Sequence, residues 1–205
     1  MSIEENKNSS VDLKRRRILT GATGVVGAAG ATFLAVPFVS SWQPSEKAKA
    51  AGAPVNADIS KLQPGQMLTV EWRGKPVWIV RRTPEMLAAL PKLDEELRDP
   101  ASSESDQPQY CQNATRAVKE EYLVVVGVCT HLGCAPLYRP AIGSPDVGED
   151  WQGGFFCPCH GSRFDLAGRV FKAVPAPTNL EIPPYHFVTD SIVRIGEGPA
   201  QGGVA

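Results

Sequence analysis

The sequence predicts an all-β domain of antiparallel strands, tethered to one N-terminal transmembrane helix. The 205 residues include 18 prolines and 19 glycines, a content typical of a loop-rich β-type protein. Residues 122–128, YLVVVGV, form the kind of β-branched run that makes a buried strand. Residues 18–45 contain no charged side chain, and their apolar part at 18–39 is as long as a membrane-spanning helix.

The composition indicates one globular domain with an appendage and argues against a nucleic-acid binder. Apolar residues make up 42% of the chain and charged residues 21%, which are ordinary values for a globular protein. Lys and Arg total 21 and Asp and Glu total 22, so the net charge is −1. Because nucleic-acid-binding domains carry a basic excess, we expect no nucleic-acid partner.

The N-terminal segment predicts a cytoplasmic tail at 1–17 followed by a transmembrane helix at 18–40. The tail holds Arg15 and Arg16 just before Ile18 and Leu19, a pattern similar to the twin-arginine export signal. As a helix, residues 18–39 rise about 33 Å, enough to cross a hydrocarbon core of about 30 Å. The basic residues at 14–17 keep the N-terminus cytoplasmic and place the rest outside. AKA at 48–50 also fits a signal-peptidase site, so cleavage stays open, although we expect the anchor to be retained.

The remaining elements follow in order along the chain. Residues 41–54 are expected to be a flexible neck, because 44–54 are small, charged and unpatterned. The globular domain then spans 55–205. Expected strands are 67–72 and 76–83, joined by a turn at 73–75, then 122–128, a short strand at 153–157 and a closing strand at 191–197. Pro84 after Thr83 predicts a short helix at 84–90, followed by a second at 92–99 and a loop at 101–113.

Two blocks, CTHLGC at 129–134 and CPCHGS at 157–162, hold four of the five cysteines and two of the three histidines. Their thiolates and imidazoles fit a mononuclear Cys₂His₂ zinc site. They equally fit a [2Fe–2S] cluster in which two cysteines bind one iron and two histidines the other. Cys134 and Cys159 are left over, and both ligand pairs would be fixed if these two formed a disulfide. An exported domain can keep such a bridge, which favours the iron–sulfur interpretation.

The two blocks resemble those of the Rieske iron–sulfur protein of the cytochrome bc1 complex. The resemblance extends to WRGKPVWIVRRT at 72–83, LRDP at 97–100, GRVFKAVPAPTNLEIP at 168–183 and the N-terminal anchor, in that family's order. It covers nearly the whole chain, and the export signal and the extended loop at 135–156 resemble the proteobacterial branch. The resemblance implies a Rieske-type antiparallel β domain with a small cluster-binding subdomain, built on the loops at 129–134 and 157–162.

The resemblance also implies a role for each residue of the blocks. The ligands of one Rieske [2Fe–2S] cluster are expected to be Cys129 and Cys157 on the inner iron and His131 and His160 on the outer iron. Cys134 and Cys159 are expected to form the disulfide. Further expected contacts are Leu132 capping the cluster and meeting the cytochrome b subunit, Ser162 donating to a cluster sulfur, and Pro175, Ala176 and Pro177 covering the cluster. One position departs from the family, because Phe164 stands where many members have tyrosine. Cys111 is expected to be a free thiol.

The function that the resemblance implies is electron transfer in a ubiquinol–cytochrome c reductase, coupled to proton translocation in respiration. His160, assisted by His131, is expected to receive an electron and a proton from ubiquinol, and the electron then passes to cytochrome c1. Expected partners are the cytochrome b and cytochrome c1 subunits in a dimeric complex. The expected location is the bacterial inner membrane, with one membrane pass and the soluble domain on the periplasmic side.

Three alternatives stay open at this stage. A Rieske ferredoxin or ring-hydroxylating oxygenase component shares the ligand pattern but usually lacks the disulfide cysteines and the anchor. The small subunit of arsenite oxidase is also exported and carries a similar cluster, but residues 72–83 and 175–177 argue against it. A zinc-stabilised binding module without a redox role is the third.

Overall fold

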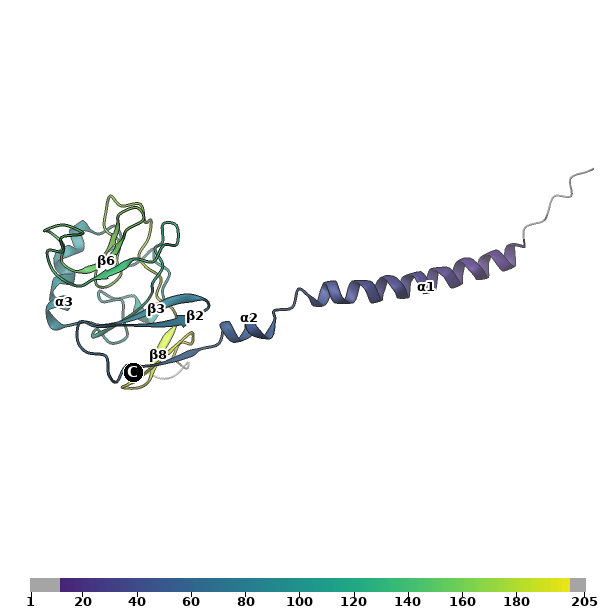
Figure 1. Cartoon of the computed structure of the whole chain (residues 1–205), viewed down its shortest axis with the longest axis horizontal. Coiled ribbons are helices and arrows are strands. Elements are labelled where there is room, and N and C mark those ends of the chain that lie inside the picture. The colour runs from purple at the N-terminus through teal and green to yellow at the C-terminus, as the bar shows by residue number, and fades with distance from the viewer. Residues whose placement is uncertain (1–11, 200–205) are drawn as a thin grey trace, which may run out of the picture. The chain divides into compact units, whose positions relative to one another are not determined.

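The computed structural model describes residues 12–199, which form two compact units that divide between Lys49 and Ala50. The first unit is dominated by helix α1, Leu13–Ser40 (Figure 1). Asp12 caps this helix, since its carboxylate accepts the backbone N–H groups of Lys14 and Arg15 at 3.0 and 3.1 Å. The cap explains why α1 begins five residues before the predicted start at Ile18.

Helix α1 has the dimensions and composition of a membrane span. Its 28 residues rise about 42 Å, and none of them is buried. Within residues 12–199 it is the one helix long and apolar enough to cross a membrane. Pro37 lies in the last turn, where a kink changes the direction of only a few residues at the end of the helix.

The segment expected to be a flexible neck contains a short helix, α2, Glu46–Ala51. An ion pair between Glu46 and Lys49, 2.7 Å apart, lies on its surface. Three alanines give this segment high helix propensity although it has no apolar stripe. That the neck is flexible stays a prediction.

The second unit contains three antiparallel sheets of three strands each. The first sheet has the order β2–β3–β4, with β2 at Met67–Trp72, β3 at Lys75–Arg81 and β4 at Tyr122–Val126. A two-residue turn joins β2 to β3, and both its residues, Arg73 and Gly74, have positive φ angles of 53° and 72°. That turn type matches the twist of the strands it connects, so the predicted hairpin is confirmed.

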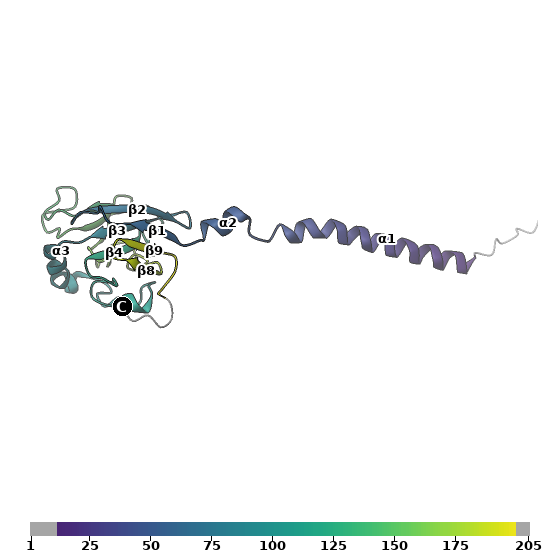
Figure 2. The same cartoon turned by 90° about the horizontal axis from the view of Figure 1, so that it is seen from below.

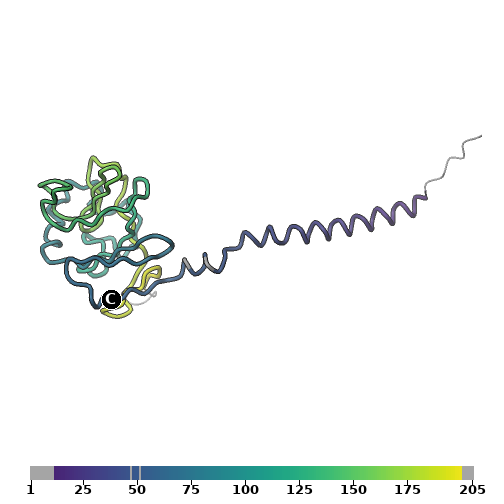
Figure 3. The backbone as a smooth tube through the Cα atoms, in the orientation of Figure 1, coloured from purple at the N-terminus to yellow at the C-terminus, as the bar shows by residue number. Residues whose placement is uncertain are grey.

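The other two sheets lie on either side of the first in Figure 1, with β6 toward one end of the domain and β8 toward the other. The order β5–β6–β7 comprises Leu137–Arg139, Gly154–Cys157 and Ser162–Phe164. The order β1–β9–β8 comprises Val55–Asp58, Ile192–Ile195 and Tyr185–Thr189. In Figure 2, β1, β9 and β8 are drawn alongside β3 and β4. Figure 3 shows the green part of the chain at the end of the domain where Figure 1 labels β6.

The core joins the first sheet to the sheet that carries the second cysteine block. The rings of Trp78 on β3 and Phe155 on β6 stack with their centroids 5.2 Å apart and their planes 14° apart. Gly127 follows β4 directly beneath Trp78, and a Cβ at this position would overlap the indole ring. A larger residue here would therefore push apart the two sheets that hold the two cysteine blocks.

Three buried arginines hold the connecting segments of this domain. Arg82, Arg116 and Arg169 all donate to the segment 165–168, through the carbonyls of Leu166, Ala167 and Gly168 and the carboxylate of Asp165. Asp165 is the one buried carboxylate that contacts any of them in the described residues. Burial lowers the pKa of Arg82 and of Arg116 to about 10, so both remain charged at neutral pH.

Several elements differ from the sequence prediction. Helix α3, Pro84–Ala89, forms as expected, with Thr83 as its cap. The expected helix at 92–99 is instead a 3₁₀ helix, η1, Leu90–Glu96, and a second 3₁₀ turn, η2, Gln109–Cys111, lies in the expected loop. Strands β1, β5, β7 and β8 were not predicted. Each has only three to five residues and owes its order to pairing across the fold.

Candidate metal centre

The first cysteine block is a tight loop that follows β4 after Gly127 and Val128. The carbonyl of Cys129 accepts the N–H of Gly133 at 3.0 Å, and the N–H of Cys129 donates to the carbonyl of Cys134 at 2.8 Å. Gly133 has a φ of +83°, a left-handed conformation that favours glycine. These bonds fold the loop back on itself and carry His131 on its outer side, half-buried.

The second block is the hairpin loop between β6 and β7. Cys157 ends β6 and pairs with Ser162 at the start of β7. The carbonyl of Cys157 accepts the N–H of Gly161 at 2.9 Å, and Gly161 has a φ of +75°. Each block therefore begins at a buried cysteine whose carbonyl is bonded to a left-handed glycine four residues later. His160 is exposed on this second loop.

The fold brings the four predicted ligands together as two pairs, one of cysteines and one of histidines. Cys129 and Cys157 are free and buried, each 2% exposed. The imidazole rings of His131 and His160 lie 4.8 Å apart between centroids and are nearly perpendicular, at 86°. The two thiols are therefore buried, whereas His131 is half-buried and His160 exposed on the same two loops.

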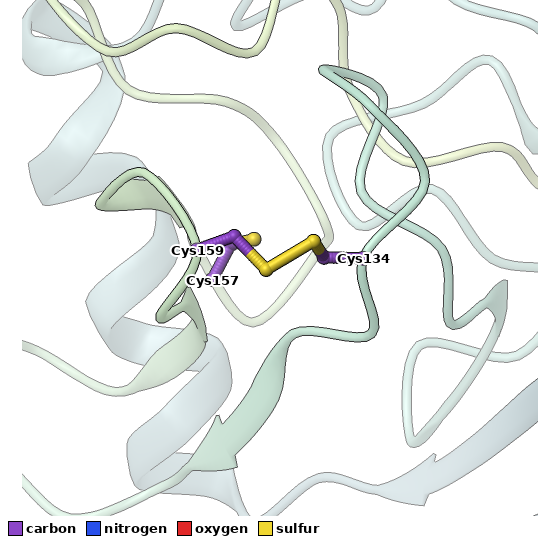
Figure 4. Close-up of side chains that lie close together, drawn as sticks. All are labelled: Cys134, Cys157 and Cys159. Atoms are coloured by element: carbon purple, nitrogen blue, oxygen red, sulfur yellow. A yellow bond between two sulfur atoms is a disulfide. The ribbon is translucent and has the colours of Figure 1, made fainter.

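A disulfide joins the two blocks. Cys134 and Cys159 are bonded, so the predicted bridge is confirmed. The sulfurs of Cys134, Cys157 and Cys159 all lie within 4.8 Å of one another, and Figure 4 shows the Cys157 sulfur beside the bridge. Two of these sulfurs are consumed by the disulfide, which leaves Cys129, Cys157 and the two histidines as the available ligands.

The donor set fits an iron–sulfur cluster. Burial raises the pKa of the Cys129 thiol, and the hydrogen bond with the neighbouring Cys157 raises it further, which favours the neutral form of this thiol. A bound cation reverses this balance, because a coordinating thiol loses its proton. Two thiolates and two neutral imidazoles are the ligands of a Rieske-type [2Fe–2S] centre.

A proline-containing loop, residues 175–177, is hydrogen-bonded to the strand that follows the second block, and that it covers the cluster stays a prediction. The backbone N–H of Ala176 donates to the hydroxyl of Ser162 at 3.1 Å, and Ala176 is fully buried. The Ser162 hydroxyl also hydrogen-bonds the Cys129 sulfur and lowers the pKa of that thiol. Ser162 thus connects the loop to a ligand, and its expected hydrogen bond to a cluster sulfur stays a prediction.

Two further residues hold the same loop and were missed from the sequence. Thr130 donates its hydroxyl proton to the carbonyl of Thr178 at 2.7 Å. The guanidinium of Arg98 donates to the carbonyls of Val174 and Pro177 at 3.3 and 3.4 Å. Thr130 lies inside the first block, so the sequence could have indicated its role. Arg98 could not be identified in this way, because only the fold brings it to residues that are 76 and 79 positions away along the chain.

The remaining predicted residues occupy contrasting surroundings. Leu132 lies at the tip of the first loop and is 72% exposed, an unusual position for a large apolar side chain. Phe164 is fully buried in the same apolar cluster as Cys129 and Cys157. Cys111 is free, as expected, and burial raises its pKa to about 11.

Comparison with known proteins assigns both parts of the chain. Residues 53–185 match the family model described as "Rieske [2Fe-2S] domain", and residues 5–45 match "Ubiquitinol-cytochrome C reductase Fe-S subunit TAT signal". The ubiquinol-cytochrome c reductase iron-sulfur subunit of Allochromatium vinosum is 63% identical, over 91% of this chain and 90% of its own length. The subunit of the same name from Blastochloris viridis is 43% identical, over 94% and 98%.

A solved structure, "Hyperthermophilic respiratory Complex III", matches 86% of this chain and 98% of its own chain at 30% identity, with a TM-score of 0.46.

The fold and the donor set define the second unit as a Rieske [2Fe–2S] domain. With its export signal and its curated relatives, the chain belongs to the family of Rieske iron–sulfur subunits of ubiquinol–cytochrome c reductase. It is therefore one subunit of complex III, with an N-terminal anchor and a translocated domain.

Proposed function

We propose that Cys129 and Cys157 bind the inner iron of the cluster and that His131 and His160 bind the outer one. The observation that carries this assignment is the grouping of two buried thiols behind two outward imidazoles, on loops joined by a disulfide. The chain then carries electrons from ubiquinol within its complex. The finer proposal is that it receives one electron and one proton from ubiquinol and passes the electron to cytochrome c1.

The ligand set suits quinol as the electron donor. Two thiolates cancel the 2+ charge of an oxidised [2Fe–2S] core, and neutral imidazoles add no charge, so the group accepts an electron at roughly −150 to +300 mV. Burial of Cys129 and Cys157 keeps water from the thiolates. His160 is the more exposed imidazole, so it is placed to hydrogen-bond the quinol hydroxyl, with His131 assisting.

We infer the partners and the location from an exposed apolar side chain and from the N-terminal segment. Exposed Leu132 stands beside His131 at the tip of the first loop, and we assign it to the contact with the cytochrome b subunit. The basic residues in the first turns of α1 and the twin-arginine signal support a bacterial inner-membrane location with the Rieske domain on the periplasmic side. We assign the chain to a dimeric complex with cytochromes b and c1, coupled to proton translocation in respiration.

The test is a ligand-by-ligand replacement in the purified complex. We expect Cys129→Ser, His131→Gln, Cys157→Ser and His160→Gln each to abolish the reduced-state EPR signal of the cluster. Cys111→Ser and His186→Gln are matched controls away from the site and should retain it. Any of the four ligand variants that keeps a full signal contradicts the assignment. Co-purification with b- and c-type haem, and not with a molybdenum subunit, checks the partners.

A further inference from the structure

The region holds more sulfur than a Rieske centre uses. In the described residues, the sulfurs of Cys134, Cys157 and Cys159 lie within 4.8 Å of one another (Figure 4). The Cys129 thiol is a fourth, since it hydrogen-bonds Cys157. Three cysteine sulfurs from two loops therefore lie together, with the Cys129 sulfur next to one of them, and a disulfide keeps two of the three from binding a metal.

That disulfide forms only after the domain has been exported. The export signal means that the chain is synthesised in the cytosol before its domain is translocated. Cytosolic thiol systems keep cysteines reduced, whereas disulfides form and persist in the periplasm. Before translocation, Cys134 and Cys159 are free thiols next to Cys157, and no reduction step is needed to produce them.

We propose that the chain with Cys134 and Cys159 reduced binds one soft divalent cation of the zinc type through Cys134, Cys157 and Cys159. Tetrahedral zinc with Zn–S bonds of about 2.3 Å places its sulfurs roughly 3.8 Å apart. The bonded sulfurs of Cys134 and Cys159 must therefore move apart on reduction, while the Cys157 sulfur already lies within 4.8 Å of both. The Cα atoms of Cys134 and Cys159 are 6.7 Å apart, which leaves room for both side chains to meet at a cation. Cys129 is placed to supply the fourth thiolate.

This site has different ligands from the cluster site, and the two sites cannot be occupied at the same time. It uses the two cysteines of the disulfide and neither histidine, and it shares Cys157 with the cluster. A zinc-type cation therefore competes with the cluster in the reduced chain. Formation of the Cys134–Cys159 bond removes two of its ligands and releases it. The disulfide thus fixes the choice of metal as well as joining the loops.

The experiment uses the full-length chain in detergent, freed of its cluster and reduced with a trialkylphosphine, which becomes the phosphine oxide. Cobalt(II) is the probe, because its visible spectrum reports tetrahedral thiolate ligands directly. We expect one equivalent to bind with sulfur-to-cobalt charge-transfer bands. Cys134→Ser and Cys159→Ser should each weaken binding by at least about tenfold. His131→Gln, His160→Gln and the control Cys111→Ser should leave it unchanged.

All variants are compared in the reduced state, so loss of the disulfide cannot explain a difference among them. Zinc should displace the cobalt, and the chain with its disulfide intact should bind neither tightly. Loss of cobalt affinity in either histidine variant would instead indicate a Cys₂His₂ site and overturn the proposal. Failure of the reduced chain to bind cobalt overturns it as well. Neither result bears on the cluster ligands, which are tested by EPR on the disulfide-bonded complex.

Discussion

At the scale of single residues, the hydrogen bonds around the ligand cysteines are the feature that tunes the centre. Ser162 and Phe164 alternate with Arg163 on β7, so both point to the buried face that contains Cys129 and Cys157. Ser162 supplies a hydroxyl at this face, while Phe164 supplies none. Because the reduced cluster carries one more negative charge than the oxidised one, a donor here stabilises reduction. Phe164 therefore leaves this face without a hydroxyl donor at a position where many members of the family have tyrosine.

Replacement of Phe164 by tyrosine should raise the midpoint potential by some tens of millivolts. One hydrogen bond is worth about 1 kcal/mol net, and for a one-electron couple about 1.4 kcal/mol corresponds to roughly 59 mV. Ser162→Ala should lower the potential by a similar or larger amount. Protein-film voltammetry on the wild type and both variants measures these shifts. An unchanged potential in Phe164→Tyr would mean that the added hydroxyl does not reach a ligand sulfur.

At the scale of elements, the site is assembled by loops that other segments hold in place. The loop at 175–177 is bonded to Ser162 on β7, to Thr130 through the carbonyl of Thr178, and to Arg98 just after η1. Arg98 brackets the loop, because its guanidinium contacts the carbonyls on both sides of Pro175 and Ala176. Since this arginine is exposed, its bonds compete with water and each contributes modestly.

Arg98→Met should loosen the loop without unfolding the domain. Two lost hydrogen bonds of about 0.5–1 kcal/mol each predict amide exchange at Ala176 that is faster by about tenfold. Hydrogen exchange read by mass spectrometry measures this change. Lys92→Met removes a charge from the neighbouring exposed surface and serves as the control. Equal protection of the loop in both variants would show that Thr130 and Ser162 hold it alone.

Asp99 makes the stability of the turn at 99–105 depend on pH. Burial raises its pKa, but hydrogen bonds from Glu104, Ser103 and Ser105 outweigh burial and lower it overall. The carboxylate therefore contributes stability above the unfolded-state pKa of about 3.9, and this contribution is lost as the pH falls through the lower folded-state value.

Asp99→Asn should lower the free energy of unfolding at pH 7 by about 1–2 kcal/mol, because charged hydrogen bonds are lost. The difference from wild type should shrink as the pH falls below 4. Urea unfolding at several pH values measures it. A difference that stays constant with pH would mean that the carboxylate charge is not what holds the turn at 99–105.

At the scale of the whole molecule, the anchor and the redox domain are separate units. Helix α1 buries none of its residues within the described chain, so its apolar surface is available to lipid or to membrane partners. The site lies entirely in the second unit, whose core includes both ligand cysteines. The chain between them runs through α2, which has six residues and no apolar stripe. A helix of this length has little stability of its own.

Prolines at residues 50–53 should therefore separate cluster assembly from turnover. They stiffen the segment without touching the second unit's core, so cluster content measured by EPR should remain at the wild-type level. Quinol-to-cytochrome c turnover should fall severalfold, because the domain must reach two partners. Wild-type turnover in this variant would show that bending of the neck is not required.

The sequence by itself determined the features that depend on local pattern. The apolar run up to Ser40 predicted the anchor and YLVVVGV predicted β4, while the family resemblance of the two blocks implied the bridge between Cys134 and Cys159. The pattern sufficed because an uninterrupted apolar run or a pair of adjacent ligands is a property of a few neighbouring residues. The start of α1 was missed by one turn, since the cap at Asp12 adds basic residues to the apolar run.

The tertiary structure alone decided what holds the site. Arg116 is fully buried and bonds carbonyls 51 to 64 positions away, and Arg98 reaches the proline-containing loop from a distant segment. Arginine side chains are usually exposed, but hydrogen bonds to distant carbonyls stabilise Arg116 in the interior. Strands β1 and β8 formed for the same reason, because each is too short to be ordered without β9 between them. Such contacts depend on segments that meet only after the chain has folded, and no local pattern encodes them.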